Sequence, residues 1–217
     1  DGSSTATTTL SLSGFIGSET VTSTNSSTFN NKNAATGKTV TVNSITLADG
    51  SNGGLAANYS ISTGQTTTAN ITAKSLTVSG ITASNKIYDG GTTAATTLSF
   101  SGLIGSETLG QTVGSTFDNK NVGTGKTVTV NSITLADGNN GGLAANYSIS
   151  PGQTTTANVT TKALTVSGIT ASNKTYDATT SATLGTGSVN YGGLVSGDDF
   201  AVSYSGVFAN ANVGSGK

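Results

Sequence analysis

Apolar and polar residues alternate along much of this chain in short stretches, a pattern typical of β-strands that bury one face. The clearest example is TVTVNSIT at residues 39–46, where threonine, asparagine and serine separate Val40, Val42 and Ile45. The phase of the alternation changes at Asn43-Ser44, which predicts a β-bulge or a short break. No stretch has the 3.6-residue period of a helix. The pattern therefore predicts an all-β fold.

Clusters of turn-forming residues separate these stretches, for example GSET at 17–20 and ADGSNGG at 48–54. They recur about every 8 to 14 residues, which favours an antiparallel, immunoglobulin-like β-sandwich of about seven or eight short strands. A parallel β-helix or solenoid is the alternative, because threonine-, asparagine- and glycine-rich strands suit it as well. It would need an inner period of about 20 to 25 residues, and we find none.

The chain repeats itself at a fixed interval. LTVSGITASNK occurs at 76–86 and again at 164–174, and Asp1, Asp89 and Asp177 are spaced by the same 88 residues. Such self-similarity predicts tandem domains. We expect residues 1–73 to form a first repeat lacking its first strand, 74–161 a complete second repeat, and 162–217 a third repeat truncated in its C-terminal half. We expect the chain to be part of a longer protein.

The third repeat departs from the spacing by a small insertion. FANANVGSGK, which begins at Phe208, matches FDNKNVGTGK, which begins at Phe117, at an interval of 91 residues. This predicts three added residues between Gly185 and Gly193. The segment 157–166, where the second repeat passes into the third, contains neither glycine nor proline, so we expect a stiff joint without a flexible linker.

Composition predicts folded domains with thin cores. Leu, Ile, Val and Phe make up about a fifth of the chain, near the lower limit for folded proteins. Nine lysines balance ten acidic residues, whereas disordered chains at this limit usually carry a large net charge. The apolar runs are far shorter than the roughly 20 residues of a membrane helix. We expect no membrane span.

The missing residue types limit the chemistry that we expect. The chain has no histidine or cysteine, so the usual nucleophile–base pairs and most transition-metal sites are excluded. It also lacks arginine and any basic excess, which argues against a nucleic-acid partner. We therefore expect a protein that is not an enzyme and has no cofactor.

One charged motif, Lys-x-Tyr-Asp, recurs at the end of the LTVSGITA stretch. It predicts an ion pair or a turn cap that pins the joint between domains. The alternative is a sugar-binding site, in which the tyrosine stacks on a sugar and the aspartate accepts hydrogen bonds from its hydroxyls. The residues concerned are Lys86, Tyr88, Asp89, Lys174, Tyr176 and Asp177.

A second tyrosine recurs after the Asp-Gly turns. Tyr147 follows the turn at Asp137-Gly138, and Tyr59 occupies the same place in the first repeat. In immunoglobulin-like domains such a tyrosine hydrogen-bonds back to a turn through its hydroxyl, forming a tyrosine corner. A tyrosine that simply packs on the rim of the core is the alternative.

Calcium and a covalent cross-link are two further alternatives. Calcium needs six to eight oxygen ligands, and the turns offer only Asp49, Asp137, Asp198 and Asp199; an ordinary turn explains them as well. An intramolecular Lys–Asn isopeptide bond assisted by an acid would stabilise a thin core. Its candidate members are Lys120, Asn121 and Glu107, with Lys32, Asn33 and Glu19 in the first repeat.

The repeated LTVSGITASNKxYDG, STFxNKNVGTGKTVTV, NYSI and TANIT resemble the YDG/MBG family of repeats in very large bacterial surface proteins, including filamentous-haemagglutinin-like adhesins. The YDG element is intact at Tyr88-Asp89-Gly90 and changes to YDA at Tyr176-Asp177-Ala178. The resemblance implies tandem modules that act as stalks or adhesive arrays, with no catalytic residues to carry over.

We therefore expect a structural stalk segment of a secreted or cell-surface bacterial adhesin or extracellular fibre, acting in adhesion and biofilm. Its expected partners are neighbouring copies of the repeat and other chains of the same protein. Two alternatives remain: a filament subunit that assembles by strand exchange, and an adhesive module that binds a glycan or matrix ligand.

Overall fold

The computed structural model describes all residues, 1–217, and it confirms the all-β prediction. The only helices are two single turns, η1 (Ala56–Asn58) and η2 (Ala144–Asn146). No helix has the length and apolar character needed to cross a membrane. The strands form several small sheets and no closed barrel, which is consistent with a β-sandwich.

The chain divides into two compact units. The first consists of residues 1–81, 98–113 and 132–151, and the second of 82–97, 114–131 and 152–217. The second sequence repeat thus contributes one part to each unit. The contacts between repeats 1 and 2 lie in the first unit, and those between repeats 2 and 3 lie in the second.

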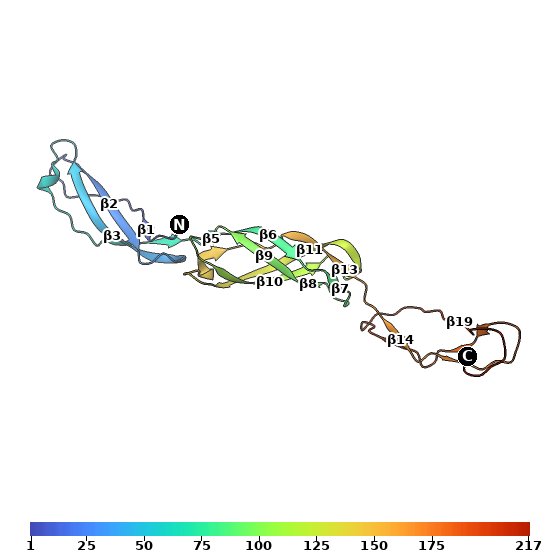
Figure 1. Cartoon of the computed structure of the whole chain (residues 1–217). Coiled ribbons are helices and arrows are strands. Elements are labelled where there is room, and N and C mark those ends of the chain that lie inside the picture. Colours follow the sequence, from blue (N-terminus) through green and yellow to red (C-terminus); the bar gives the residue numbers. More distant parts are fainter. The chain divides into compact units, whose positions relative to one another are not determined.

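Repeat 1 forms a four-stranded sheet in the order β1-β2-β3-β4 (Figure 1). All three strand pairs are antiparallel. Ser26 pairs with Ser44 and Ser27 with Val42, so Asn43 is skipped and forms the bulge that the phase change predicts. The strands are β1 (Thr5–Ala6), β2 (Val21–Phe29), β3 (Ala35–Asp49) and β4 (Thr66–Ile71).

Repeat 2 contains a five-stranded sheet in the order β7-β13-β11-β10-β8 and two further pairs, β6-β9 and β5-β12. The β5-β12 and β7-β13 pairs are parallel and only two residues long, a detail that the antiparallel prediction missed. Its strands are β5 (Lys74–Ser75), β6 (Thr77–Ala83), β7 (Lys86–Ile87), β8 (Thr93–Ala94), β9 (Thr96–Ser101), β10 (Leu109–Phe117), β11 (Gly123–Asp137), β12 (Tyr147–Ser148) and β13 (Thr154–Thr160).

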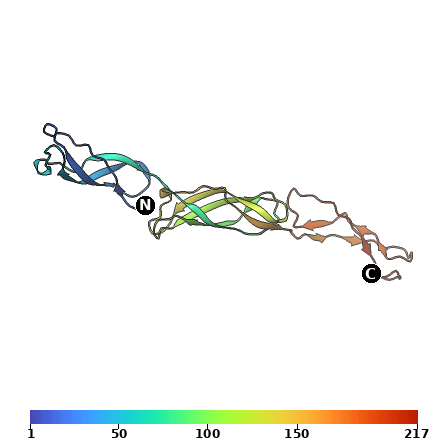
Figure 2. The same cartoon turned by 90° about the horizontal axis from the view of Figure 1, so that it is seen from above.

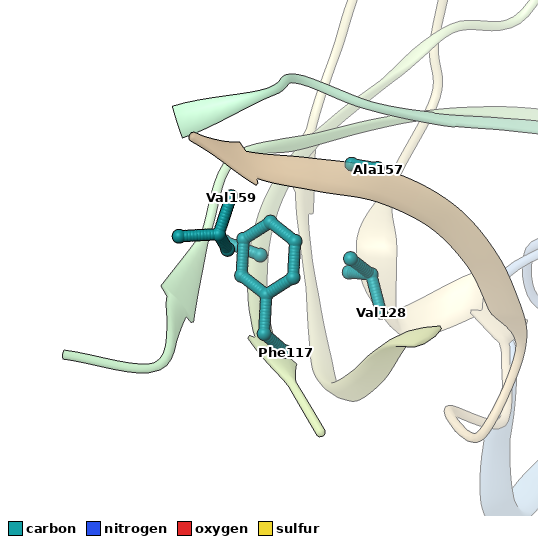
Figure 3. Packing of buried hydrophobic residues seen from close by; sticks show 5 residues of the cluster. Phe117, Val128, Ala157 and Val159 are labelled. Carbon is teal, nitrogen blue, oxygen red and sulfur yellow. The ribbon is translucent and has the colours of Figure 1, made fainter. Parts of the chain in front are cut away.

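The core of repeat 2 is small and rich in valine. Figure 3 shows the Phe117 ring between Val128 and Val159, with Ala157 beside them. Val128 and Val130 of β11 are completely buried, because the alternation in TVTV turns both valines to one face. The same pattern buries Val40 in β3. The core is therefore thin, as composition predicts, and valines are its most deeply buried residues in both repeats.

Repeat 3 has strands but no buried residue between 161 and 217. Its strands, orange to red in Figure 2, pair only in twos: β14-β18, β15-β17 and β16-β19. The chain holds no counterpart of β11 in this repeat, so the strand that carries the buried valines elsewhere is missing. The strands are β14 (Thr165–Ser167), β15 (Thr170–Ala171), β16 (Ser181–Ala182), β17 (Leu184–Gly185), β18 (Asn190–Gly192) and β19 (Gly206–Val207).

Candidate functional site at the joints between repeats

The Lys-x-Tyr-Asp motif of repeat 2 closes a loop within its own repeat. Lys86 Nζ lies 2.7 Å from Asp89 Oδ1 and donates to the carbonyl oxygens of Gly91 and Thr93 at 2.8 and 3.2 Å. Asp89 Oδ1 also accepts the Gly91 N–H at 2.9 Å. The hydrogen bond from Lys86 and that from Gly91 lower the pKa of the Asp89 carboxyl. The lysine and the aspartate therefore act together as a turn cap.

Repeat 3 builds the same cap. Lys174 Nζ lies 2.7 Å from Asp177 Oδ1 and donates to the carbonyl oxygen of Thr179 at 2.9 Å. Hydrogen bonds from Lys174 and Thr179 lower the pKa of Asp177 to about 2. Lys174 lies 5.8 Å from the centre of the Phe208 ring, as Lys86 does from the Phe117 ring. The cap thus also holds a lysine over an aromatic residue of its own repeat.

The tyrosine of the motif in repeat 2 points out of its loop to the next repeat. The Tyr88 hydroxyl donates to Asp198 Oδ1 at 3.1 Å, and Lys120 Nζ lies 3.3 Å from the same oxygen. Lys120 Nζ is also 6.0 Å from the Tyr88 ring centre. Tyr88 and Lys120 lower the pKa of Asp198, and the Tyr88 hydroxyl and Asp198 raise the pKa of Lys120. Two residues of repeat 2 thus converge on one carboxylate of repeat 3, at what we call the second joint.

A matching ion pair links repeats 1 and 2, at what we call the first joint. Lys32 Nζ lies 3.1 Å from Glu107 Oε1, and the Tyr147 hydroxyl donates to Glu107 Oε2 at 2.5 Å. The Ile104 N–H donates to the Tyr147 hydroxyl at 3.0 Å. The Tyr147 hydroxyl and Lys32 lower the pKa of Glu107, and burial and Glu107 raise the pKa of Tyr147. The residue Glu107 is only 8% exposed.

The two ion pairs occupy equivalent positions in the repeats. Lys32 and Lys120 are 88 residues apart, and Glu107 and Asp198 are 91 residues apart, which includes the three-residue insertion. Each lysine comes from an Asn-rich loop after the Phe of STF, and each acid comes from the GSE or GDD turn of the following repeat. The same charged contact is therefore made at both joints.

A glycine contact also recurs at both joints. Gly2 has φ of 75°, and a methyl group in place of its hydrogen would lie 2.7 Å from Ile104 Cγ2. Gly90 has φ of 81°, and a methyl group there would lie 2.7 Å from Val195 Cγ1. Both the left-handed backbone and the close approach require glycine. The glycines after Asp1 and Asp89 therefore each fit against an apolar side chain of the next repeat.

A family model described as the YDG domain matches residues 1–69, 72–157 and 160–217. The chain belongs to the YDG domain family. The three matched segments follow the three sequence repeats, and together they cover nearly the whole chain. No curated protein and no solved structure matches it.

Further contacts close the first joint between the YDG repeats. The Ala34 N–H donates to Asn146 Oδ1 at 2.8 Å, and Asn146 Nδ2 donates to Asn33 Oδ1 at 3.3 Å. A cavity of about 50 Å³ remains there. At the second joint the cavity is about 530 Å³.

The remaining predicted residues have roles within turns. Asp49 Oδ1 accepts the Ala56 N–H and Asp137 Oδ1 accepts the Ala144 N–H, both at 2.7 Å. Asp199 Oδ1 accepts the N–H of its neighbour Phe200 at 2.8 Å. No three acidic residues come together as metal ligands would. Each aspartate instead supports the turn in which it lies.

Tyr59 and Tyr147 use their hydroxyls as a tyrosine corner does, but over a longer distance in sequence. Tyr147 reaches the turn at 104–107, and Glu107 lies 40 positions before it rather than in the adjoining Asp-Gly turn. Tyr59 reaches Ile16 and Glu19 in the same way. Each hydroxyl therefore orients a carboxylate, and at Glu107 that carboxylate also contacts Lys32 of the preceding repeat.

The cross-link hypothesis placed a lysine and an acid in one repeat, whereas the structure pairs them between repeats. Lys120 contacts Asp198, 78 residues later, and Glu107 contacts Lys32, 75 residues earlier. A search at the 88-residue interval does not find this pairing, because the two lysines are 88 residues apart and the two acids are 91 residues apart. The close contact of Gly2 and Gly90 has a signal in the sequence, because a glycine follows both Asp1 and Asp89, which are one repeat interval apart.

Proposed function

We propose that these YDG repeats are a structural extender in a secreted or cell-surface bacterial adhesin or extracellular fibre. One observation carries the proposal: the same lysine–acid and glycine–apolar contacts occur at both joints. A stalk needs each repeat to hold its neighbour in the same way, so that added copies extend it. The resemblance to repeats of large bacterial surface proteins supports a location outside the cell.

The contacts at a joint are suited to holding a geometry. Isolated exposed ion pairs contribute little, but the Glu107 carboxylate is nearly buried and bound from two sides by Tyr147 and Lys32. The glycine contact adds steric definition, because only a residue without a side chain fits the space. The turn cap at Asp89 keeps the loop that carries Tyr88 and Gly90 to the second joint in one conformation.

A distance measurement across the first joint tests the proposal. The chain has no cysteine, so cysteines introduced at the exposed Ser44 and Ser132 can carry the only two spin labels. We expect a narrow distribution of distances between the two labels, measured by electron–electron double resonance. A broad distribution in the unmodified joint would show freely rotating repeats, and the stalk proposal would then fail.

A further inference from the structure

The end of repeat 1 that carries Glu19 is a second copy of the surface that repeat 1 covers on repeat 2. The Tyr59 hydroxyl donates to Glu19 Oε2 at 2.5 Å and accepts the Ile16 N–H at 3.3 Å. Tyr147, Glu107 and Ile104 have the same arrangement at the first joint. The acid is therefore already oriented in repeat 1, although no lysine pairs with it.

The matching surfaces of repeats 1 and 2 differ in solvent exposure, because repeat 1 covers the surface on repeat 2 and no repeat in this sequence covers the surface on repeat 1. Ile16 is 73% exposed, whereas Ile104 is half-buried against Gly2. Tyr59 is half-buried, whereas Tyr147 is only 6% exposed. The Phe15 ring packs edge-on against Tyr59 with centroids 5.6 Å apart and supports it from its own repeat. The surface is thus formed and oriented before any partner binds, which lowers the entropy cost of binding.

We infer that this surface, defined by Phe15, Ile16, Glu19 and Tyr59, is a docking site for another YDG repeat. The end of that repeat that docks is the one that carries Gly2 and Lys32 in repeat 1. The inference rests on the proposed function and names the partner that it requires. The partner carries a lysine at the position of Lys32 or Lys120, which pairs with Glu19. It also carries a glycine at the position of Gly2 or Gly90, which fits against Ile16. The contact at the first joint supplies both the charge complementarity and the steric match.

The corresponding positions of this chain's own third repeat do not meet that description. Its sequence FANAN has Ala211 where FDNKN has Lys120, and its YDA has Ala178 where YDG has Gly90. Ala178 keeps the left-handed backbone, with φ of 64°, but adds the methyl group for which the joint has no room. A second copy of this chain, docking by its third repeat, is therefore not the expected occupant.

An in-register extension of the chain tests the inference. A duplicate of residues 1–88 placed before Asp1 continues the repeat without a break, because Asp1 then follows a tyrosine as Asp89 follows Tyr88. The added Lys32 is then expected to contact Glu19, and the added Gly2 to contact Ile16, as Lys32 and Gly2 contact Glu107 and Ile104 at the first joint. We expect a paramagnetic solvent probe to relax the Ile16 methyl groups less, and the Ile16 amide to exchange on the order of tenfold more slowly.

Two variants of the added copy separate specific docking from simple crowding. The added Lys32→Ala and the added Gly2→Val should each restore the accessibility of Ile16, and Lys162→Ala, far from this surface, should not. An Ile16 that stays accessible in the extended chain would overturn the inference. So would protection of Ile16 in the original chain by self-association, because a second copy would then be the occupant. The Ser44–Ser132 distance reports on the stalk proposal independently.

Discussion

The two joints make the same contacts in different surroundings. At the first joint the acid is nearly buried: the Glu107 side chain is 7% exposed, and about 50 Å³ of space is left. At the second joint the Asp198 side chain is 26% exposed beside a cavity of about 530 Å³. The lysines are alike, 44% and 49% exposed. The receiving repeat, and not the lysine, therefore determines how tightly a joint closes.

The tyrosine that holds the acid explains the difference. At the first joint Tyr147 comes from the C-terminal half of the receiving repeat and packs beneath Glu107. At the second joint Tyr88 comes from the preceding repeat.

Gly90→Val tests the steric half of a joint and should have the largest effect. A β-branched residue at φ of 81° is strained by about 1–3 kcal/mol, and its side chain also meets Val195. Gly125→Val is the matched control, because Gly125 has φ of 58° and open space around it. Both should lower the melting temperature. Only Gly90→Val should broaden the distance between labels at Thr156 and Asn190, and equal broadening in both variants would refute the contact.

Glu107→Gln tests the charged half of the first joint. It keeps the size of the side chain but removes the charge that Lys32 and Tyr147 bind. We expect a broader Ser44–Ser132 distance distribution and a lower melting temperature. Glu19→Gln is the control, because Glu19 has the same tyrosine and no lysine. If the two variants lower the melting temperature equally, the lysine contributes nothing to the joint.

The strands and the core residues could be predicted from the sequence because they depend on local periodicity. The alternation around Val40 and Val128 shows which residues are buried, and the phase change at Asn43 locates the bulge. The Lys86–Asp89 contact spans only three residues, so a short motif contains both partners. In each of these cases the sequence neighbours are also the spatial neighbours.

The contacts at the joints could not be predicted from the sequence in the same way. Lys32 and Glu107 are 75 residues apart, and no local pattern shows which end of a repeat each one faces. Lys120 and Glu107 lie in one repeat and were paired in the cross-link hypothesis, although Glu107 contacts Lys32 at the first joint and Lys120 contacts Asp198 at the second. Gly90 is recognisable as a turn residue, but only the fold shows that Val195 lies against it.

Tyr147→Phe should weaken the first joint by less than Glu107→Gln. It removes one hydrogen bond to a charged acceptor and leaves Lys32 in place, a loss of about 1–2 kcal/mol. Tyr59→Phe removes the equivalent bond in repeat 1, where no joint depends on it. Chemical denaturation should show a loss of stability in both variants. A broader Ser44–Ser132 distance is expected in Tyr147→Phe alone, and its absence would mean that Lys32 fixes Glu107 without help.

Acid should break the ion pairs at the joints before it breaks the Lys174–Asp177 turn cap of repeat 3. The folded-state pKa values of Glu107 and Asp198 lie below their ordinary values. Their contribution is therefore complete above the unfolded pKa, about 4, and is lost as the pH falls through the folded pKa. The Lys174–Asp177 cap follows the same rule but persists further, because the pKa of Asp177 is about 2.

The effect at each joint is small, since the lysines are solvated and salt screens them. Carboxyl chemical shifts followed by NMR from pH 6 to pH 2 measure the order directly. Glu107 and Asp198 should titrate before Asp177, and the Ser44–Ser132 distance should broaden over the interval in which Glu107 titrates. A distance that stays narrow after Glu107 is protonated would assign the stiffness of the joint to its glycine and asparagine contacts rather than to its charges.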